Sequence, residues 1–199
     1  MKRVHGRGPD AWVFSPKDLV DLAGRAAVDQ ALSRLVRQGR LRRVGRGLYE
    51  RPRMSRVLGR AAPVDLESAV HAIARRDGLR LMPDGLAAAN RLGLTNAVPA
   101  KAVYWTDGSS RAVQAGGHTV RFKHVNPVLM QWADRAAAPV VSALVWLGPA
   151  LAGDAETVAQ LRRRLPADVK DDLADGLAQL PTWALPIVRA ITGSERRPA

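Results

Sequence analysis

One polar face of the segment from residue 24 to residue 38 carries side chains that could read the edges of DNA bases. At 100° per residue, Gln30, Ser33 and Arg37 fall on the same side of a helix as the small Ala26. An amide can pair with adenine through two hydrogen bonds, and a guanidinium can do the same with guanine. The opposite face is apolar. The candidate DNA-binding residues of this helix and its flanks are Arg25, Ala26, Asp29, Gln30, Ser33, Arg34 and Arg37.

The apolar face must hold this helix against a core, and the residues before it predict a second, shorter helix. Val28, Leu32 and Leu35, with Ala31 beside them, form the stripe expected to be buried. Upstream, Ser15 can cap a helix that has Pro16 at its first position and Asp18 three residues after the cap. This helix is expected to reach Ala23 and to turn at Gly24 into the longer one. A helix, a tight turn and a second helix are typical of a helix-turn-helix.

An arginine-rich hairpin is predicted directly after the longer helix. Gly39 can supply the left-handed cap that ends the helix, and Gly45-Arg46-Gly47 separates two short apolar-anchored segments, Leu41–Val44 and Leu48-Tyr49. Such a pattern predicts a two-stranded wing. Arg42, Arg43 and Arg46 are expected to contact phosphates, because the glycines would let the tip approach a duplex closely.

A winged helix usually begins with a further helix that packs across the other two, and Met1–Asp10 is too short and too charged to form a good one. We therefore expect the missing packing to come from residues upstream of this sequence, from the second domain or from a partner subunit.

The positive charge is concentrated in this first part of the chain. Residues 1–60 hold fifteen Lys and Arg against five Asp and Glu, whereas residues 61–199 hold sixteen against thirteen. An amphipathic helix with exposed arginines is most often just a solvated helix. A local basic excess on a helix-turn-helix and its wing instead favours nucleic-acid binding.

The rest of the chain predicts a second domain of mixed α and β structure. The expected organisation is a winged helix-turn-helix domain over 1–51, a linker over 52–63 and an α+β domain over 64–199. The strands expected in a small antiparallel sheet are 103–106 and 119–122, because both are rich in β-branched and aromatic residues. The predicted helices cover 65–78, 84–90, 140–147, 155–165, 169–180 and 183–191.

No motif predicts catalysis, a cofactor or a metal, so we do not expect an enzyme. The chain has no cysteine, which excludes disulfides and thiolate ligands, and its four histidines form no ligand cluster. A stripe of aspartates at helical spacing could bind a cation or a basic partner, but such stripes are mostly solvated faces; its members are Asp168, Asp171, Asp172 and Asp175. Neither a signal peptide nor a membrane-spanning run is present, which predicts a cytoplasmic protein.

Several runs of the sequence resemble one family of regulators. Val13–Leu19, Arg25–Val36 and Arg46–Tyr49 look like the AbiEi-type antitoxins of type IV toxin–antitoxin (abortive infection) systems, in the DUF6088-like subgroup. The similarity spans about residues 11–190, and its blocks in the second domain are Leu94, Val98–Lys101, Thr106–Gly108 and Phe122–His124.

This resemblance implies an N-terminal winged helix that represses its own operon and a C-terminal domain that counters a nucleotidyltransferase-like toxin. Antitoxins of this type are thought to act without a stable complex with the toxin, so the expected physical partner is double-stranded operator DNA. The alternative is an RNA-binding or ribosome-associated winged helix, since a basic segment binds either polymer through phosphates. Readers of single-stranded RNA usually display stacking aromatics, and Trp12, Phe14 and Tyr49 stand at positions better explained as core.

Overall fold

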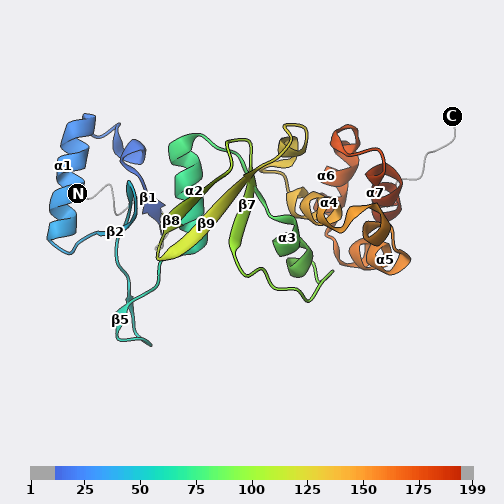
Figure 1. Cartoon of the computed structure of the whole chain (residues 1–199), viewed down its shortest axis with the longest axis horizontal. Coiled ribbons are helices and arrows are strands. Elements are labelled where there is room, and N and C mark those ends of the chain that lie inside the picture. The colour runs from blue at the N-terminus through green and yellow to red at the C-terminus, as the bar shows by residue number, and fades with distance from the viewer. Residues whose placement is uncertain (1–11, 194–199) are drawn as a thin grey trace. The chain divides into compact units, whose positions relative to one another are not determined.

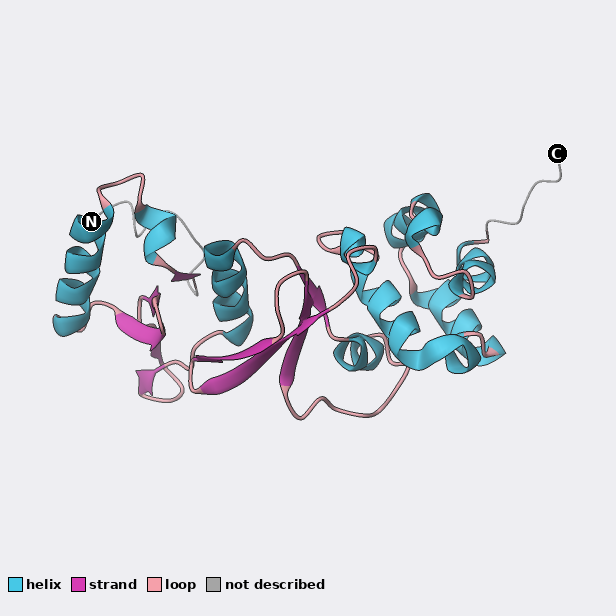
Figure 2. Cartoon of the chain, turned by 45° about the horizontal axis from the view of Figure 1, so that its top comes forward, coloured by secondary structure: helices cyan, strands magenta, loops and turns pink. Residues whose placement is uncertain are grey.

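The computed structural model describes residues 12–193, and it confirms the predicted mixture of α and β structure (Figures 1 and 2). The interpretation of Met1–Asp10 lies outside the described residues. The α-helices are α1 Arg25–Arg37, α2 Leu66–Asp77, α3 Gly85–Arg91, α4 Ala138–Ala152, α5 Ala155–Arg164, α6 Ala167–Asp175 and α7 Ala184–Thr192, with 3-10 turns η1 Pro16–Leu19, η2 Leu129–Trp132 and η3 Leu177–Gln179. The strands are β1 Val13–Phe14, β2 Arg42–Gly45, β3 Leu48–Glu50, β4 Met54–Ser55, β5 Arg60–Ala61, β6 Leu81–Pro83, β7 Ala102–Thr106, β8 Arg111–Ala115 and β9 His118–His124.

The chain forms two compact units whose limits differ from the predicted domains. Within the described residues, the first unit consists of 12–79 and 112–120, and the second consists of 80–111 and 121–193. The predicted boundary placed 64–79 in the second domain, whereas these residues, including α2, belong to the first unit. The chain passes between the units after residues 79, 111 and 120, so no single cut divides it into the two.

The main sheet is larger than the small antiparallel sheet that the sequence predicts. Seven strands follow the order β1-β3-β2-β8-β9-β7-β6, and the predicted segments 103–106 and 119–122 form β7 and β9. The pairs β1–β3, β2–β3, β2–β8 and β6–β7 are antiparallel. β8 was not predicted, because Arg111–Ala115 has a single β-branched residue and no aromatic one.

In the first unit, α2 packs on the strands at the start of the described part of the chain. It contacts β1 and β3, and its Ala69, Val70 and Ile73 are fully buried. Polar contacts hold both of its ends: the Val13 N–H donates to Ser68 Oγ over 2.9 Å, and Arg75 Nη2 donates to the Val13 carbonyl over 2.9 Å. The helix that the sequence assigned to the second domain is therefore an integral part of the first unit.

The predicted apolar stripe of α1 is buried in part: Val28 and Leu32 are buried, whereas Ala31 and Leu35 are half-buried. Val28 and Leu32 pack in one cluster with Phe14, Leu19 and Leu41. The preceding segment begins as predicted, because Asp18 Oδ2 accepts from the Ser15 N–H over 2.7 Å and Pro16 opens the turn. It ends at Leu19 as a single 3-10 turn and does not reach Ala23 as a helix.

Residues 52–63, predicted as a linker, contain a small hairpin. β4 and β5 pair antiparallel, with Met54 opposite Ala61 and Ser55 opposite Arg60, in a sheet of their own. The sequence analysis missed this hairpin because it has too few residues to show an alternating pattern.

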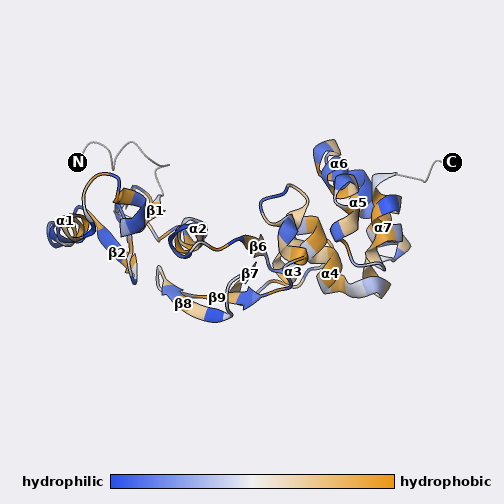
Figure 3. Cartoon of the chain, turned by 90° about the horizontal axis from the view of Figure 1, so that it is seen from above, coloured by the Kyte–Doolittle hydropathy of each residue, from blue (hydrophilic) through white to orange (hydrophobic). Residues whose placement is uncertain are grey.

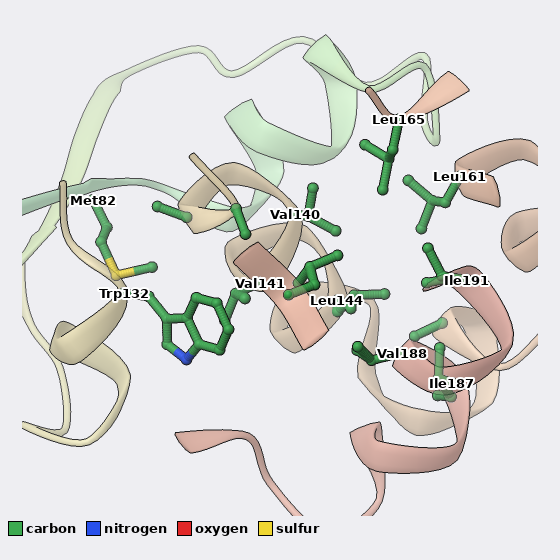
Figure 4. Packing of buried hydrophobic residues seen from close by; sticks show 14 of the residues in the cluster. Met82, Trp132, Val140, Val141, Leu144, Leu161, Leu165, Ile187, Val188 and Ile191 are labelled. Carbon is green, nitrogen blue, oxygen red and sulfur yellow. The ribbon is translucent and has the colours of Figure 1, made fainter. Parts of the chain in front are cut away.

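The second unit has its own core, which explains why its helices follow the predicted ranges closely. Figure 4 shows Trp132 beside Val141, with side chains of α4, α5 and α7 meeting around Leu144. α4 is coloured largely hydrophobic in Figure 3, whereas α1 is coloured largely hydrophilic. α4 is interrupted at Gly148, whose φ of 71° and ψ of 173° are not helical, so the predicted break after Leu147 is confirmed and a short helical segment follows to Ala152. The predicted helix over 169–180 is divided into α6 and η3. In the described part of the chain, no helix has both the length and the apolar character needed to cross a membrane.

An ion pair ties α6 to the turn that leads into α4, and it should make the stability of the second unit depend on pH. Asp172 accepts from Arg135 Nε and from the Ala137 N–H, each over 2.8 Å. Desolvation by burial acts to raise the pKa of Asp172, but the hydrogen bonds and the charge of Arg135 outweigh it, so the pKa lies below its ordinary value. The carboxylate therefore stabilises the fold at neutral pH, and this contribution is lost as the pH falls through the folded-state pKa.

We predict that Asp172→Asn lowers the free energy of unfolding by about 1–3 kcal/mol at neutral pH, the range for hydrogen bonds to charged groups. The difference between wild type and variant should shrink as the pH falls below about 4, where the carboxyl of the unfolded chain becomes protonated, and should vanish below the folded-state pKa. Urea unfolding at a series of pH values measures it, with the exposed Asp171→Asn on the same helix as control. Equal stability of the two variants at neutral pH would contradict the assigned role of the ion pair.

Candidate nucleic-acid interface

The polar face of α1 is free of protein contacts that would bury it. Ala26, Gln30, Ser33 and Arg37 are all exposed, and so is Arg34. The opposite side of the same helix is fixed, because Val28 and Leu32 are nearly fully buried. The helix begins after Gly24 and ends before Gly39, which has the left-handed φ of 67° expected for its position. The predicted division of α1 into a packed face and an exposed polar face is confirmed.

Two of the candidate residues on α1 pair with each other. Arg25 Nε lies 2.9 Å from Asp29 Oδ2, one helical turn away, and both side chains are about half exposed. An exposed pair of this kind contributes little to stability. Arg25 can therefore exchange Asp29 for a phosphate at small cost, while Asp29 itself can only accept hydrogen bonds.

The glycine-rich tip between β2 and β3 is built into the first unit. Gly45 pairs with Ala115 of β8, and a Cβ atom on Gly45 would lie 2.8 Å from the Gln114 carbonyl oxygen. Arg76 of α2 donates through Nη1 to the Arg46 carbonyl over 2.6 Å. Gly45 therefore allows β2 to approach β8 closely. The prediction that this glycine lets the tip approach a DNA duplex is corrected accordingly.

The three arginines predicted for the wing are placed differently from one another. The side chains of Arg43 and Arg46 are exposed, and Arg43 Nε donates to the Gly45 carbonyl over 3.3 Å. Arg42 is half-buried: its Nε donates to Glu50 Oε1, directly opposite in the β2–β3 pair, and its Nη2 donates to the Ala62 carbonyl over 2.6 Å. Glu50 is buried. Arg42 therefore serves the fold, and Arg43 and Arg46 remain as candidates for contact with phosphates.

We predict that Arg42→Ala lowers the free energy of unfolding by about 2–4 kcal/mol, because it leaves the buried carboxylate of Glu50 without its cation. Arg43→Ala, one residue away and exposed, is the matched control and should change stability by less than about 0.5 kcal/mol. Chemical denaturation followed by circular dichroism compares the two. If both variants unfolded at the same denaturant concentration, the structural role of Arg42 would be wrong.

The other polar groups that the sequence analysis singled out are mostly exposed or paired where the structure describes them. No cluster of histidine and carboxylate residues suited to a metal ion occurs in residues 12–193. Of the aspartate stripe, Asp172 is paired with Arg135, while Asp168, Asp171 and Asp175 are exposed. His124 Nδ1 lies 3.1 Å from the Gly108 carbonyl oxygen. His5 lies outside the described residues.

A comparison with protein-family models places the chain in a family. A search of curated proteins found no match for the chain, and neither did a search of solved structures. The model of a family of unknown function, DUF6088, matches residues 4–167. This match covers most of the chain, and the chain therefore belongs to the DUF6088 family.

Proposed function

We propose that this protein is a sequence-specific DNA-binding regulator of winged-helix type that reads the major groove with α1. The observation that carries the proposal is the exposed polar face of α1, whose opposite face packs in a hydrophobic core through Val28 and Leu32. β1 and η1 before this helix, β2 and β3 after it, and α2 packed on β1 and β3 support the winged-helix interpretation. The basic excess of residues 1–60 supports attraction to a polyanion.

The dimensions of α1 suit a major groove. Its 13 residues span about 20 Å at 1.5 Å per residue, and B-DNA presents a groove wide enough to admit one helix. Gln30 and Arg34 are expected to read bases, because an amide and a guanidinium can each form two hydrogen bonds to one purine. Arg37, near the end of the helix, is expected to hold it on the backbone.

The aromatic residues of the first unit favour duplex DNA over single-stranded RNA. The rings of Trp12 and Phe14 stack with centroids 4.9 Å apart, and the rings of Phe14 and Tyr49 lie 6.3 Å apart. Phe14 is buried. These rings are used in packing among themselves, so they are poorly placed to stack on unpaired bases.

We predict that Gln30→Ala relaxes the preference at one base pair of the site by about 1–3 kcal/mol. Gln38→Ala is the matched control, since Gln38 follows the last residue of the helix and lies off the polar face. Binding to a set of duplexes in which each base pair is varied in turn measures the effect. A loss that was equal for every duplex would exclude base reading by Gln30.

We further propose that the protein represses its own operon and acts as the antitoxin against a nucleotidyltransferase-like toxin encoded beside it. The sequence resemblance to AbiEi-type antitoxins is the support for this part of the proposal. Co-expression with the neighbouring reading frame, scored by growth, tests protection, and a promoter-reporter assay tests repression. Unrelieved toxicity in the presence of folded full-length protein would count against the antitoxin role and leave DNA binding to be judged separately.

A further inference from the structure

The β4–β5 hairpin presents an unusual surface. Two apolar side chains at the turn of the hairpin are exposed, Val57 and Leu58, and Val57 is 94% exposed, whereas Met54 in β4 lines a cavity beside α1. Arg53, Arg56 and Arg60 are exposed between and around them, and residues 51–64 contain no carboxylate. Apolar side chains held in water at a tip, surrounded only by positive charge, indicate a surface with a partner.

The hairpin is fastened at its base and ordered at its turn. The Ala62 N–H donates to the Arg53 carbonyl over 2.7 Å, and the Ala62 carbonyl accepts from Arg42, whose guanidinium also pairs with Glu50. At the turn, the Gly59 N–H donates to the Ser55 carbonyl over 2.9 Å, with Gly59 at a left-handed φ of 60°. The base is therefore coupled to β2 and β3.

This hairpin is better placed to act as a wing than the β2–β3 hairpin. The tip of β2–β3 is held by β8 and α2, as described above. Figure 1 shows the β4–β5 hairpin extending away from β2 and the rest of the first unit. Both hairpins belong to the same compact unit as α1.

We propose that the tip of the β4–β5 hairpin enters the minor groove of duplex DNA beside the site that α1 reads. This inference rests on the proposed function and adds a second contact to it. Minor-groove binders combine arginines with apolar side chains that press against base steps, and the hairpin offers Arg56 next to Val57 and Leu58. The minor groove is about 6 Å wide, and the axes of two paired strands alone lie about 4.8 Å apart. The groove can therefore admit the turn, whereas the two-stranded ribbon behind the turn stays at the sugar-phosphate backbone of the DNA.

The test compares two double variants of the full chain in binding to duplex DNA from upstream of its own gene. Arg56→Ala with Arg60→Ala should weaken binding about tenfold and reduce the slope of log affinity against log salt by up to about 1.8, because about 0.9 is lost for each phosphate contact. Val57→Ser with Leu58→Ser should weaken binding severalfold without changing the slope. Arg162→Ala with Arg163→Ala, exposed on α5, is the charge-matched control and should leave binding unchanged.

A second arm locates the contact in the minor groove. Replacing G·C by inosine·C removes only the guanine amino group of the minor groove and leaves the major-groove pattern intact. At the hairpin's position this replacement should tighten binding by wild type, and the Val57→Ser with Leu58→Ser variant should lose that response. Circular dichroism confirms that each variant is folded.

The outcomes separate this inference from the proposed function. If wild type bound the duplex and lost binding on substitution in α1, while both hairpin variants bound like wild type, the hairpin inference would be overturned and the proposed function would stand. An inosine response that was the same in wild type and the Val57→Ser with Leu58→Ser variant would also overturn it. If wild type bound no duplex, or bound single-stranded RNA through the hairpin instead, both would be wrong.

Discussion

Replacing Arg34 and Arg37 together by glutamate is expected to weaken DNA binding by about a hundredfold or more. Each arginine that contacts a base or a phosphate contributes about 1–3 kcal/mol, and a glutamate in its place is repelled by the phosphates. Both side chains are exposed on α1, so the substitution should leave the core formed by Val28 and Leu32 intact. Fluorescence anisotropy with a labelled duplex at fixed salt concentration measures the loss.

The control for this variant carries the same change of charge elsewhere. Arg162 and Arg163 are exposed near the end of α5, and their replacement by glutamate alters the net charge by the same amount. Long-range attraction depends on net charge, whereas local contact depends on position. If the α1 and α5 variants lost affinity equally, the basic charge of the whole chain would explain the binding and α1 would not be its reading element.

Gly85→Ala should strongly destabilise the second unit. A Cβ atom at Gly85 would lie 2.3 Å from Trp146 Cβ and 2.7 Å from the Ser142 carbonyl oxygen. Both atoms are fixed to the backbone of α4, so the methyl group can fit only if α3 moves away from α4. We expect a loss of about 2–4 kcal/mol, which is the upper range for overpacking. For a chain of this size, that corresponds to a fall in Tm of about 5–15 °C.

Two matched variants make the prediction specific to the contact between α3 and α4. Ser142→Ala removes a buried hydroxyl that has no hydrogen-bond partner, so it should be neutral or slightly stabilising. Gly24→Ala adds the same methyl group where no atom lies within 4 Å and φ is −56°, and it should cost less than about 1 kcal/mol. Thermal unfolding of Gly85→Ala at the wild-type Tm would show that α3 and α4 do not pack as closely as described.

Local patterns in the sequence predicted the parts of the fold that depend on near neighbours. The apolar stripe of α1 repeats with the helical period, and burial of Val28 and Leu32 follows from that repeat alone. The start of η1 was also predictable, because Ser15 and Asp18 are three residues apart. The helices of the second unit are bounded by Gly and Pro, which gave most of their limits to within two or three residues.

The sequence could not predict the contacts that join distant segments. α2 packs on β1 through Ser68 and Val13, 55 residues apart, and no local pattern signals such a pair. β2 meets β8 about 70 residues further along the chain, through Gly45 and Ala115. Neither contact was predicted from the sequence. The first domain was therefore predicted to end before α2, and the β2–β3 tip was expected to be free.

The structural role of Arg42 could have been predicted from the sequence. Arg42 and Glu50 have opposite charges and stand on either side of the Gly45–Gly47 tip, where hairpin pairing places them opposite each other. Reading this pair from the sequence would have assigned Arg42 to the fold. The exposure of Val57 and Leu58 carried no such signal, since a short apolar pair is as common in a core as at a tip.

The most direct test of DNA binding by α1 is a titration of the full-length protein with two labelled duplexes, one from upstream of its own gene and one with the same bases in shuffled order. We predict tighter binding to the upstream duplex by at least about a thousandfold, the lower end of the usual range that separates specific from non-specific sites. This preference should be lost in the variant with Arg34 and Arg37 replaced by glutamate. Equal affinity of the wild-type protein for the two duplexes, or a preference that survives in that variant, would contradict it.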